Sequence, residues 1–259
     1  MVATAQLRTA RRQVDESRVF AHPIMNSWAL PETLTVQPDT SKGPEVWLAI
    51  ATDRSLCGAV NARLLKQVRP LLEEAKLQDR KNLELFVLGE KGRSSLERDN
   101  KRFLSTVFTD LARCKELTFK QSLAYTDAVL KSNPSKGSIF YNHFVNAMSF
   151  ETRRVSFVDL DTQVANTQFL SDHTYNRDHE NYKNYYEAKL AATMFNFWAE
   201  NVGSEISARM SAMSTSSKNA EDIAFVLNRF YNRQRQAKIT SELIEINSGA
   251  QVIAEQGDQ

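Results

Sequence analysis

Residues 205–247 read EISARMSAMSTSSKNAEDIAFVLNRFYNRQRQAKITSELIEIN, and this stretch decides the fold. It belongs to a longer segment, residues 182–252, that lacks proline and is rich in residues that favour helix. Apolar residues recur along the segment at alternating steps of three and four, which is the pattern of a coiled-coil seam. The seam positions are Leu190, Met194, Phe197, Ile206, Met210, Met213, Ala220, Ile223, Leu227, Tyr231, Ile239, Leu243 and Ile246.

The length of this helix limits how it can be accommodated. A helix of roughly 70 residues is on the order of 100 Å long at about 1.5 Å of rise per residue. A compact domain of this chain's size is nearer about 40 Å across by the usual radius scaling. We therefore expect the helix to extend beyond the compact part of the protein.

A second helix is expected at the N-terminus, over residues 1–20, where one apolar stripe lies among charged residues. An amphipathic helix of that length is marginal alone, so it needs a partner, and the C-terminal helix is the natural one. Residues 21–44 contain four prolines among Thr, Ser and Asp. Because proline removes a backbone donor and disfavours helix before it, this segment indicates an irregular connector.

The middle of the chain alternates between strand and helix patterns, which is typical of a small mixed α/β sheet. Residues 46–51 (VWLAIA) form a continuous apolar run, as expected for a buried parallel strand. The other expected elements are a helix through residues 62–71, a strand at 83–88, a turn at 89–94, a helix at about 120–130, paired strands at 137–148 and 153–160, and a loop at 161–178.

Composition and charge exclude several classes of protein. The 259 residues are 42% hydrophobic and 25% charged, with a formal net charge of +2, which gives no sign of a nucleic-acid partner. No apolar run reaches the roughly 18 residues that a membrane-spanning helix needs. The two cysteines, Cys57 and Cys114, lack the spacing of a disulfide framework or a zinc site, so a reducing compartment is expected.

Three local patterns carry possible chemistry, and each has a simpler interpretation that we favour. Cys57 lies at a strand-to-helix turn and is a candidate nucleophile, but a half-buried cysteine at a tight turn explains it better. Residues 89–95 follow a strand as a phosphate-binding loop does, yet they lack the GxxxxGK[ST] pattern. A polar cluster has metal-ligand residue types without helical spacing, which favours a solvated loop. Its members are Asp172, His173, Asp178 and His179.

A basic segment lies on the C-terminal helix, and no Asp or Glu occurs between Asp222 and Glu242. A charge run on a helix is usually a solvated face. The missing carboxylates favour a partner here, and nucleic acid is the rival to a protein, although the contact residues of a basic leucine zipper are absent. The basic segment consists of Arg229, Arg233, Arg235 and Lys238.

The C-terminal helix also carries a family resemblance. Residues 207–213 (SARMSAM), 217–220 (SKNA), 231–240 (YNRQRQAKIT) and 242–250 (ELIEINSGA) follow one another in a fixed order. Together they resemble, without gaps, the C-terminal helix of the gamma subunit of F-type ATP synthase. The resemblance extends to the N-terminal helix of this family, which pairs antiparallel with the C-terminal one. The family's first helix has several further turns before Met1, so this sequence departs from the family there.

The α/β part carries the same resemblance. Residues 53–59 (DRSLCGA) are similar to the family's signature turn, although Ser55 replaces the usual glycine. Residues 137–144 (GSIFYNHF) are similar to its central strand, with His143 where an arginine is common.

The resemblance implies a fold and a division of the chain. The fold is α/β: the N- and C-terminal helices form a long antiparallel two-helix coiled coil, and a small Rossmann-like α/β domain is inserted between them. The expected segments are the N-terminal coiled-coil helix at residues 1–20, the connector at 21–44, the α/β domain at 45–178, the C-terminal coiled-coil helix at 179–254 and a tail at 255–259.

The resemblance also implies a function. It implies the central-stalk rotor subunit of a proton-translocating ATP synthase, which transmits torque from the membrane c-ring to the catalytic alpha/beta hexamer. The expected partners are the alpha and beta subunits, the c-ring and small central-stalk subunits of the delta or epsilon type, with no nucleic acid. No catalytic residue, cofactor or metal is expected in this chain, because catalysis in the family belongs to the beta subunits.

Site residues follow from the resemblance. Apolar contacts vary little with rotation, and basic side chains suit transient charge-assisted contacts. The expected contacts with the alpha/beta hexamer are Arg209, Arg235, Gln236, Ile239, Leu243 and Ile246. The expected contacts with the c-ring or a small stalk subunit are Asn184, Tyr185 and Glu187.

Location and the remaining alternatives complete the expectations. Residues 242–246 (ELIEI) resemble mitochondrial and related bacterial members more than chloroplast ones, and the regulatory cysteine pair of the chloroplast branch is absent. We therefore expect a peripheral protein on the matrix side of the mitochondrial inner membrane.

A coiled-coil scaffold with an α/β head is one alternative, and it predicts a stable homodimer. A cysteine-dependent or nucleotide-dependent enzyme is the other, and it predicts turnover or nucleotide binding by the isolated chain.

Overall fold

The protein is described by a computed structural model that covers residues 2–27, 29, 34, 36–39, 41–109, 118–166 and 179–257. The chain divides into two compact units, Met1–Ala212 and Met213–Gln259. We call them the first unit and the second unit.

A five-stranded sheet with the strand order β3-β2-β1-β4-β5 forms the centre of the first unit. Neighbouring strands run parallel except β4 and β5, which form an antiparallel hairpin. The central strand β1 is buried on both faces, which explains its continuous apolar sequence. The strands are β1 (Glu45–Ile50), β2 (Leu83–Leu88), β3 (Leu104–Phe108), β4 (Lys136–Asn146) and β5 (Ser149–Val158).

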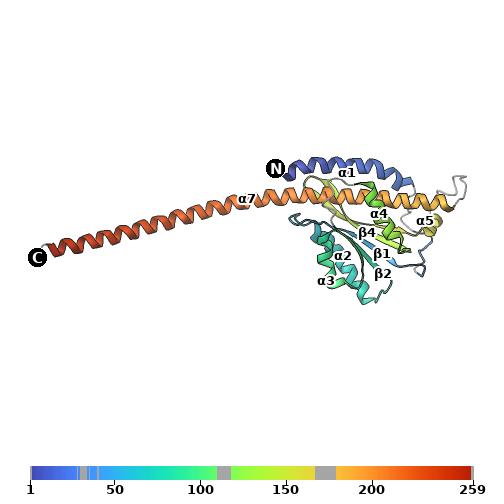
Figure 1. Cartoon of the computed structure of the whole chain (residues 1–259), viewed down its shortest axis with the longest axis horizontal. Helices are drawn as coiled ribbons and strands as arrows, with labels where there is room; N and C mark the ends of the chain where they lie inside the picture. Colours follow the sequence, from blue (N-terminus) through green and yellow to red (C-terminus); the bar gives the residue numbers. More distant parts are fainter. Residues whose placement is uncertain are drawn as a thin grey trace. The chain divides into compact units, whose positions relative to one another are not determined.

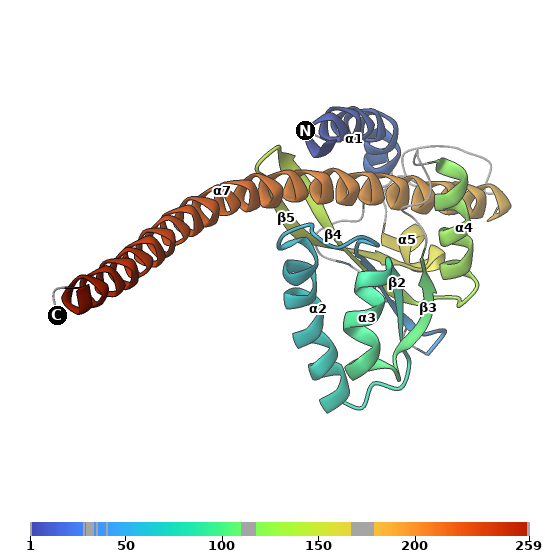
Figure 2. The same cartoon turned by 60° about the vertical axis from the view of Figure 1, so that its left-hand side comes forward.

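Helices cover both faces of this sheet (Figures 1 and 2). Successive side chains of β1 point to opposite faces, so the strand supplies two cores. Trp47 and Ala49 pack with α2 (Val60–Leu77) and α3 (Glu90–Asn100). Leu48 and Ile50 pack with α4 (Phe119–Leu130) and with the N-terminal part of α7 (His179–Gly257). The predicted α/β fold class is confirmed.

Helix α1 (Val2–Ser27) lies along the N-terminal part of α7 and runs antiparallel to it (Figure 1). Ser17 donates a hydrogen bond to Asn196 Oδ1 at 3.2 Å. Val14 packs closely on Gly203, where an added Cβ would lie 2.8 Å from Val14 Cγ2. Positions later in α1 therefore meet positions earlier in α7, as predicted for the two terminal helices.

The end of α1 differs from the prediction. The helix was expected over residues 1–20 with a connector from 21, but it continues through Pro23 to Ser27. Ala21 is fully buried, and Met25 packs against the core that α7 and the sheet share. Packing of these two side chains outweighs the backbone donor that Pro23 lacks.

Four further elements depart from the prediction. Helix α3 begins at Glu90, inside the predicted turn, and its buried side chains are too few to give a helical pattern. Strand β5 begins at Ser149, four positions before the predicted start. The prediction missed these positions because one face of the strand is charged and exposed, which hides its apolar pattern. Helix α5 (Leu160–Asn166) occupies the start of the predicted loop and buries polar side chains, so no apolar period indicates it. Strand β3 was also not predicted.

Helix α7 continues without interruption from His179 to Gly257, a span of 79 residues. This confirms the predicted unbroken C-terminal helix. In the isolated chain, every residue from Met213 to Ala250 is exposed. None of the helices in the described part of the chain is long and apolar enough to cross a bilayer.

The first part of the predicted seam has an additional partner. Leu190, Met194 and Phe197 are buried in the same core as Leu48 and Ile50 of β1. These seam residues thus pack against the sheet, and not only against α1. The helix is therefore part of the α/β core as well as part of the helix pair.

A core substitution tests this packing. Leu48 is fully buried in β1, so Leu48→Ala is expected to lower the free energy of unfolding by about 2–5 kcal/mol through lost burial and a residual cavity. Leu77→Ala is the matched control, since Leu77 is 88% exposed, and it is expected to change stability by less than about 0.5 kcal/mol. Denaturant unfolding of both variants provides the measurement. Equal losses would contradict the two-core arrangement.

Candidate functional site

The second unit presents large apolar side chains to solvent. Of the predicted hexamer contacts, Ile239 is 48% exposed, Leu243 58% and Ile246 67%. Phe225 and Phe230 are exposed to a similar degree. Such a concentration of exposed apolar area is unusual for a helix with no partner and marks an interaction surface.

The basic segment begins among these apolar side chains, at Arg229 before Phe230, and ends at Lys238 directly before Ile239. Arg235 and Gln236 are both exposed, as are the other members of the segment. The Arg229 guanidinium lies 5.9 Å from the centre of the Phe225 ring. Lys238 lies 3.8 Å from the Glu242 carboxylate, a distance at which an exposed ion pair contributes little. The basic segment therefore keeps most of its charge available for a partner.

Arg209, the remaining predicted hexamer contact, has a different environment. Its side chain is largely buried in the first unit, and its guanidinium forms an ion pair with Glu205 one turn earlier in α7. Burial raises the pKa of the Glu205 carboxyl, while the hydrogen bond from Arg209 opposes that shift. The guanidinium is thus engaged within the chain, and its contact with a partner stays a prediction.

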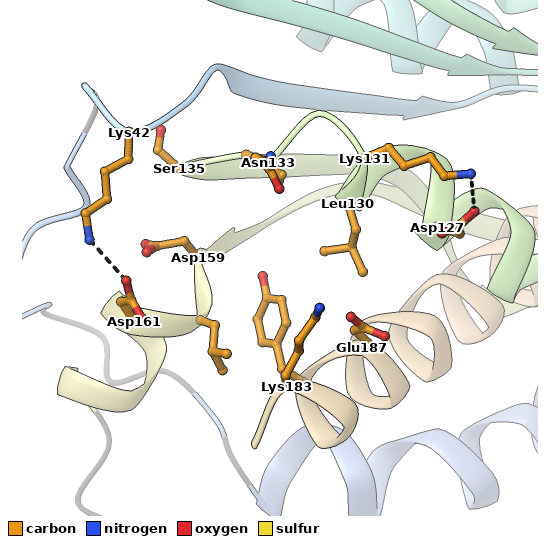
Figure 3. Close-up of a pocket in the computed structure, with 13 residues that line it drawn as sticks. Lys42, Asp127, Leu130, Lys131, Asn133, Ser135, Asp159, Asp161, Lys183 and Glu187 are labelled. Atoms are coloured by element: carbon orange, nitrogen blue, oxygen red, sulfur yellow. Dashed lines mark hydrogen bonds and ion pairs between the residues drawn. The ribbon is translucent and has the colours of Figure 1, made fainter. Parts of the chain in front are cut away.

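Of the three predicted contacts at the other end of α7, one lines a groove of about 480 Å³ (Figure 3). Glu187 lines the groove directly, and Asn184 is exposed beside it in sequence. The Tyr185 hydroxyl is hydrogen-bonded to Ser27 of α1. This tyrosine therefore helps to hold α1 on α7.

Charged side chains from α4, α5 and α7 converge on the groove. Lys42 pairs with Asp161 at 3.1 Å, and Lys131 pairs with Asp127 at 2.7 Å (Figure 3). Asp159 Oδ1 is buried, and no side chain or backbone group of the described residues forms a hydrogen bond with it. An orphaned carboxylate oxygen of this kind favours a cationic group from outside the chain.

The turn that contains Cys57 has a structural role. The thiol is 4% exposed and lies 3.4 Å from Asn61 Nδ2. This agrees with the interpretation of Cys57 as a buried residue at a tight turn. The same turn positions Asp53, whose Oδ1 accepts a hydrogen bond of 2.9 Å from the backbone N–H of Glu90 at the start of α3.

These contacts fill the places where this kind of fold binds ligands. A helix N-terminus after a parallel strand is a common phosphate site, and here the Asp53 carboxylate already occupies it. Open sheets of this kind also bind ligands at the carboxyl ends of the strands where the strand order reverses. In this sheet that place is the carboxyl end of β1, which lies between β2 and β4. The Asn201 side chain of α7 lies there and donates a hydrogen bond of 3.1 Å to the Ala51 carbonyl.

The predicted polar cluster falls mostly outside the described residues. This applies to Asp172, His173 and Asp178, while His179 is the first residue of α7. Within the described ranges, no group of three or more His, Cys, Asp or Glu side chains is placed to hold a metal ion. Cys114 also lies outside the described residues.

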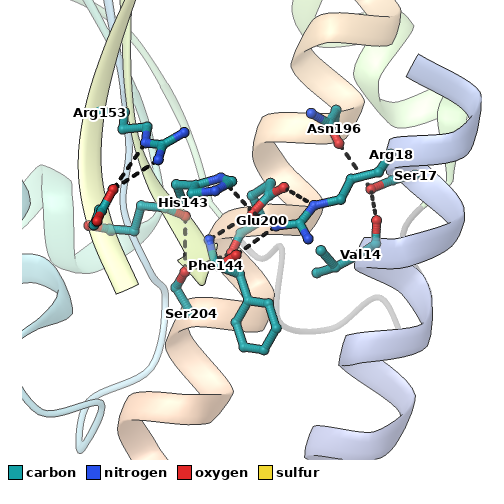
Figure 4. A network of polar contacts seen from close by, with 11 residues as sticks. Val14, Ser17, Arg18, His143, Phe144, Arg153, Asn196, Glu200 and Ser204 are labelled. Carbon is teal, nitrogen blue, oxygen red and sulfur yellow. Dashed lines mark hydrogen bonds and ion pairs between the residues drawn. The ribbon is translucent and has the colours of Figure 1, made fainter. Parts of the chain in front are cut away.

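No local sequence pattern predicts the buried ionic cluster around Glu200 of α7 (Figure 4), and its one signal is His143, which stands where an arginine is common in the family. Arg18 of α1 donates from Nε to Glu200 Oε1 at 2.6 Å and from Nη2 to Oε2 at 3.0 Å. The Phe144 backbone N–H donates to Oε2 at 2.7 Å, and His143 Nδ1 lies 3.1 Å from the same oxygen. We call Arg18, His143, Phe144 and Glu200 the Glu200 cluster. It joins α1, β4 and α7.

Electrostatics in the Glu200 cluster follow from its burial. The Glu200 side chain is 1% exposed, so a paired arginine is needed to compensate its charge. The hydrogen bond to Glu200 raises the pKa of Arg18, which keeps the guanidinium charged. Burial lowers the pKa of His143, and Glu200 opposes that shift. Burial and the Glu200 carboxylate raise the pKa of Tyr141 to about 12.

Comparison with known proteins identifies the family. The family model described as ATP synthase matches residues 1–253. The chain is 34% identical over 254 residues to the mitochondrial ATP synthase F(1) complex subunit gamma of Rattus norvegicus, covering 96% of this chain and 90% of the relative. The chain belongs to the gamma-subunit family of ATP synthase. The resemblance found in the sequence is thereby confirmed.

Other gamma-family members agree. The mitochondrial F(1) complex subunit gamma of Dictyostelium discoideum is 30% identical over 262 residues, covering 98% of this chain and 84% of that one. A chain of the central stalk and c-ring structure of the Tetrahymena thermophila mitochondrial ATP synthase superposes with a TM-score of 0.70 at 22% identity, covering 84% of this chain and 96% of its own. A Euglena gracilis mitochondrial ATP synthase chain gives 0.71 at 13% identity, covering 100% and 95%. The structural matches establish the gamma-family fold.

Acid is expected to destabilise this gamma-family chain through His143. Because burial lowers the pKa of His143 below its ordinary value of 6.5, the unfolded chain binds a proton that the folded chain binds less readily. Stability from this group is therefore complete above pH 6.5 and is lost as the pH falls through the folded pKa. His143→Gln is expected to remove this part of the pH dependence, measured by denaturant unfolding between about pH 5 and pH 8.

The control for this measurement is His22→Gln, since His22 is exposed on α1. It is expected to leave the slope of stability against pH unchanged. A wild-type slope in the His143→Gln protein would show that His143 does not contribute to the acid sensitivity.

Proposed function

We propose that this chain is the central-stalk rotor subunit of a proton-translocating ATP synthase and carries torque from the membrane c-ring to the catalytic alpha/beta hexamer. Helix α7 carries the proposal: it spans 79 residues, and its residues from Met213 to Ala250 are exposed in the isolated chain. A helix with that much exposed apolar surface needs a surrounding partner. Gamma-family membership supports the alpha/beta hexamer as that partner.

The second unit works inside the hexamer. Ile239, Leu243 and Ile246 form apolar contacts, which are non-directional and change little as the helix turns. Arg235 and Gln236 form transient contacts with polar or acidic loops of the beta subunits, because charge-assisted hydrogen bonds are strong only in a defined geometry. Arg209, in the last turns of α7 that belong to the first unit, also contacts the beta subunits. The different side chains around the helix let one shaft present different surfaces to three identical catalytic sites.

The chain itself is not catalytic under this proposal. Asp53 caps the α3 N-terminus, and Asn201 fills the position at the end of β1 where a nucleotide would bind in a related fold. The catalytic sites therefore belong to the beta subunits. No cofactor or metal is assigned to this chain.

The groove at the start of α7 lies in the part of the chain that contacts the membrane side of the complex. Asn184, Tyr185 and Glu187 contact the c-ring or a small central-stalk subunit of the delta or epsilon type. The buried Asp159 oxygen and the Glu187 carboxylate supply negative charge in the groove, which suits a lysine or arginine of that partner.

Location follows from the same assignment. The relatives described above are mitochondrial, and the chain accordingly belongs in the mitochondrion. As part of the proposal we place it on the matrix side of the inner membrane, as a peripheral subunit. The division into a first helix, a connector, an α/β domain at 45–178, a coiled-coil helix and a tail stays part of this proposal. Its bounds move where the helices do: α1 extends to Ser27 into the connector predicted at 21–44, and α7 extends past the predicted 179–254 to Gly257, into the tail predicted at 255–259.

Loss of the Arg235 and Gln236 side chains tests the hexamer contact. The double variant Arg235→Ala, Gln236→Ala is expected to reduce coupled ATP synthesis by about tenfold, a loss of about 1.4 kcal/mol that fits one or two charge-assisted hydrogen bonds. Synthesis is measured in energised membranes with equal amounts of complex. Lys66→Ala, Gln67→Ala, on the exposed side of α2, is the matched control. Equal activity in both variants would remove the pair from the contact set.

A charge reversal tests the groove. Glu187→Lys is expected to release the small stalk subunit from the purified complex. The substitution removes the carboxylate that attracts a basic group of the partner and puts a positive charge there that repels it. Asp99→Lys, exposed on α3, makes the same charge change away from the groove and is expected to retain the subunit. Subunit content is read by mass spectrometry after salt washing. Retention in both variants would contradict this contact.

A further inference from the structure

One face of α7 is hydrogen-bonded to the sheet over two turns. At about 100° per residue, Glu200, Asn201, Ser204 and Ser207 lie within about 120° of one another around the helix. All four are buried, with exposed fractions of at most 1%. A row of buried polar side chains is uncommon on a helix face that packs against a sheet, where apolar residues are usual.

Each of these four residues bonds to a specific group of a strand or of the β4–β5 turn. Asn201 accepts from Asn142 Nδ2 at 2.9 Å in addition to its bond with the Ala51 carbonyl. Ser204 donates to the Asn142 carbonyl at 3.0 Å. Ser207 donates to the Ala147 carbonyl at 2.7 Å. Glu200 accepts from the Phe144 N–H and from Arg18 (Figure 4).

These bonds constrain α7 differently from its apolar contacts. Leu190 and Met194 pack without directional preference, so a small turn of the helix about its axis costs them little. Hydrogen bonds weaken steeply as the donor angle bends, and a buried group that loses its partner finds no water to replace it. The polar row therefore resists rotation of α7 about its own axis, which the apolar core resists only weakly.

We propose that Glu200, Asn201, Ser204 and Ser207 are positioning residues that form a torsional lock between α7 and the sheet, with Arg18 extending the lock to α1. This rests on the proposed rotor function. Because α7 is one continuous helix, torque on its C-terminal half must be resisted where its N-terminal half is held. The lock supplies that resistance and makes the first unit turn with the helix.

The test compares a lock variant with an apolar variant in the assembled ATP synthase. Asn201→Leu removes two hydrogen bonds and keeps a side chain branched at the same carbon, and Leu190→Ala weakens the apolar core of the same helix. Thermal unfolding of each complex fixes an assay temperature well below both transitions. At that temperature Asn201→Leu is expected at least to halve the number of protons pumped per ATP hydrolysed, while Leu190→Ala keeps the wild-type ratio.

A milder variant and a covalent rescue cover a failure of Asn201→Leu to assemble. Ser207→Ala removes one hydrogen bond and is expected to lower the pumping ratio to a smaller extent. In a Glu200→Gln background, Ser17→Cys with Asn196→Cys introduces a disulfide between α1 and α7. Ser17 Oγ and Asn196 Oδ1 now lie 3.2 Å apart at this place. Oxidation is expected to restore the ratio, and reduction to lose it again.

The outcomes separate the lock from the proposed function. If the wild-type chain does not enter the complex or support pumping, the proposed function fails. If the wild-type chain enters the complex and supports pumping, the lock can be tested. The lock is overturned if the pumping ratio falls only in proportion to thermal stability and does so equally in the lock variants and in Leu190→Ala. A disulfide that leaves the ratio unchanged overturns the extension of the lock to α1.

Discussion

Burial of the N-terminal half of α7 against the parallel sheet is the constraint on which the first unit depends. Leu190, Met194 and Phe197 complete the core on one face of β1, so the helix cannot leave without exposing that core. The same helix lies beside α1, and the buried Glu200 carboxylate of α7 binds both Arg18 of α1 and the Phe144 backbone N–H of β4. Apolar burial supplies most of the stability, while the polar row sets the rotational position of the helix.

The same packing places protein side chains where this type of sheet commonly binds a ligand. An open parallel sheet binds ligands at the carboxyl ends of its strands, where the strand order reverses. Asn201 occupies that place, and Asp53 takes the N–H of Glu90 that would otherwise meet a phosphate. The architecture of a binding domain is thereby used to hold a helix.

Much of the fold could be predicted, and the failures have physical causes. Strand β2 is a nearly continuous apolar run, helix α7 carries a long apolar repeat, and the gamma-family motifs identified the family. Pro23 misled the prediction of α1 because packing of Ala21 and Met25 overrides local preference. Helix α3 carries almost no apolar period. The Glu200 cluster joins Arg18 to a residue 182 positions away, and no local pattern reveals such a pair; the single signal was His143, which stands where the family has arginine.

The exposed second unit has a consequence for the life of the chain before assembly. Phenylalanine, leucine and isoleucine side chains that stay in water until a partner covers them are recognised by chaperones and quality-control proteases as marks of an incomplete protein. A copy made in excess of its partners would be degraded rather than stored. Under the proposed function, the exposed surface of the second unit would thus also set the cellular abundance of the subunit, because only copies that find a hexamer would persist.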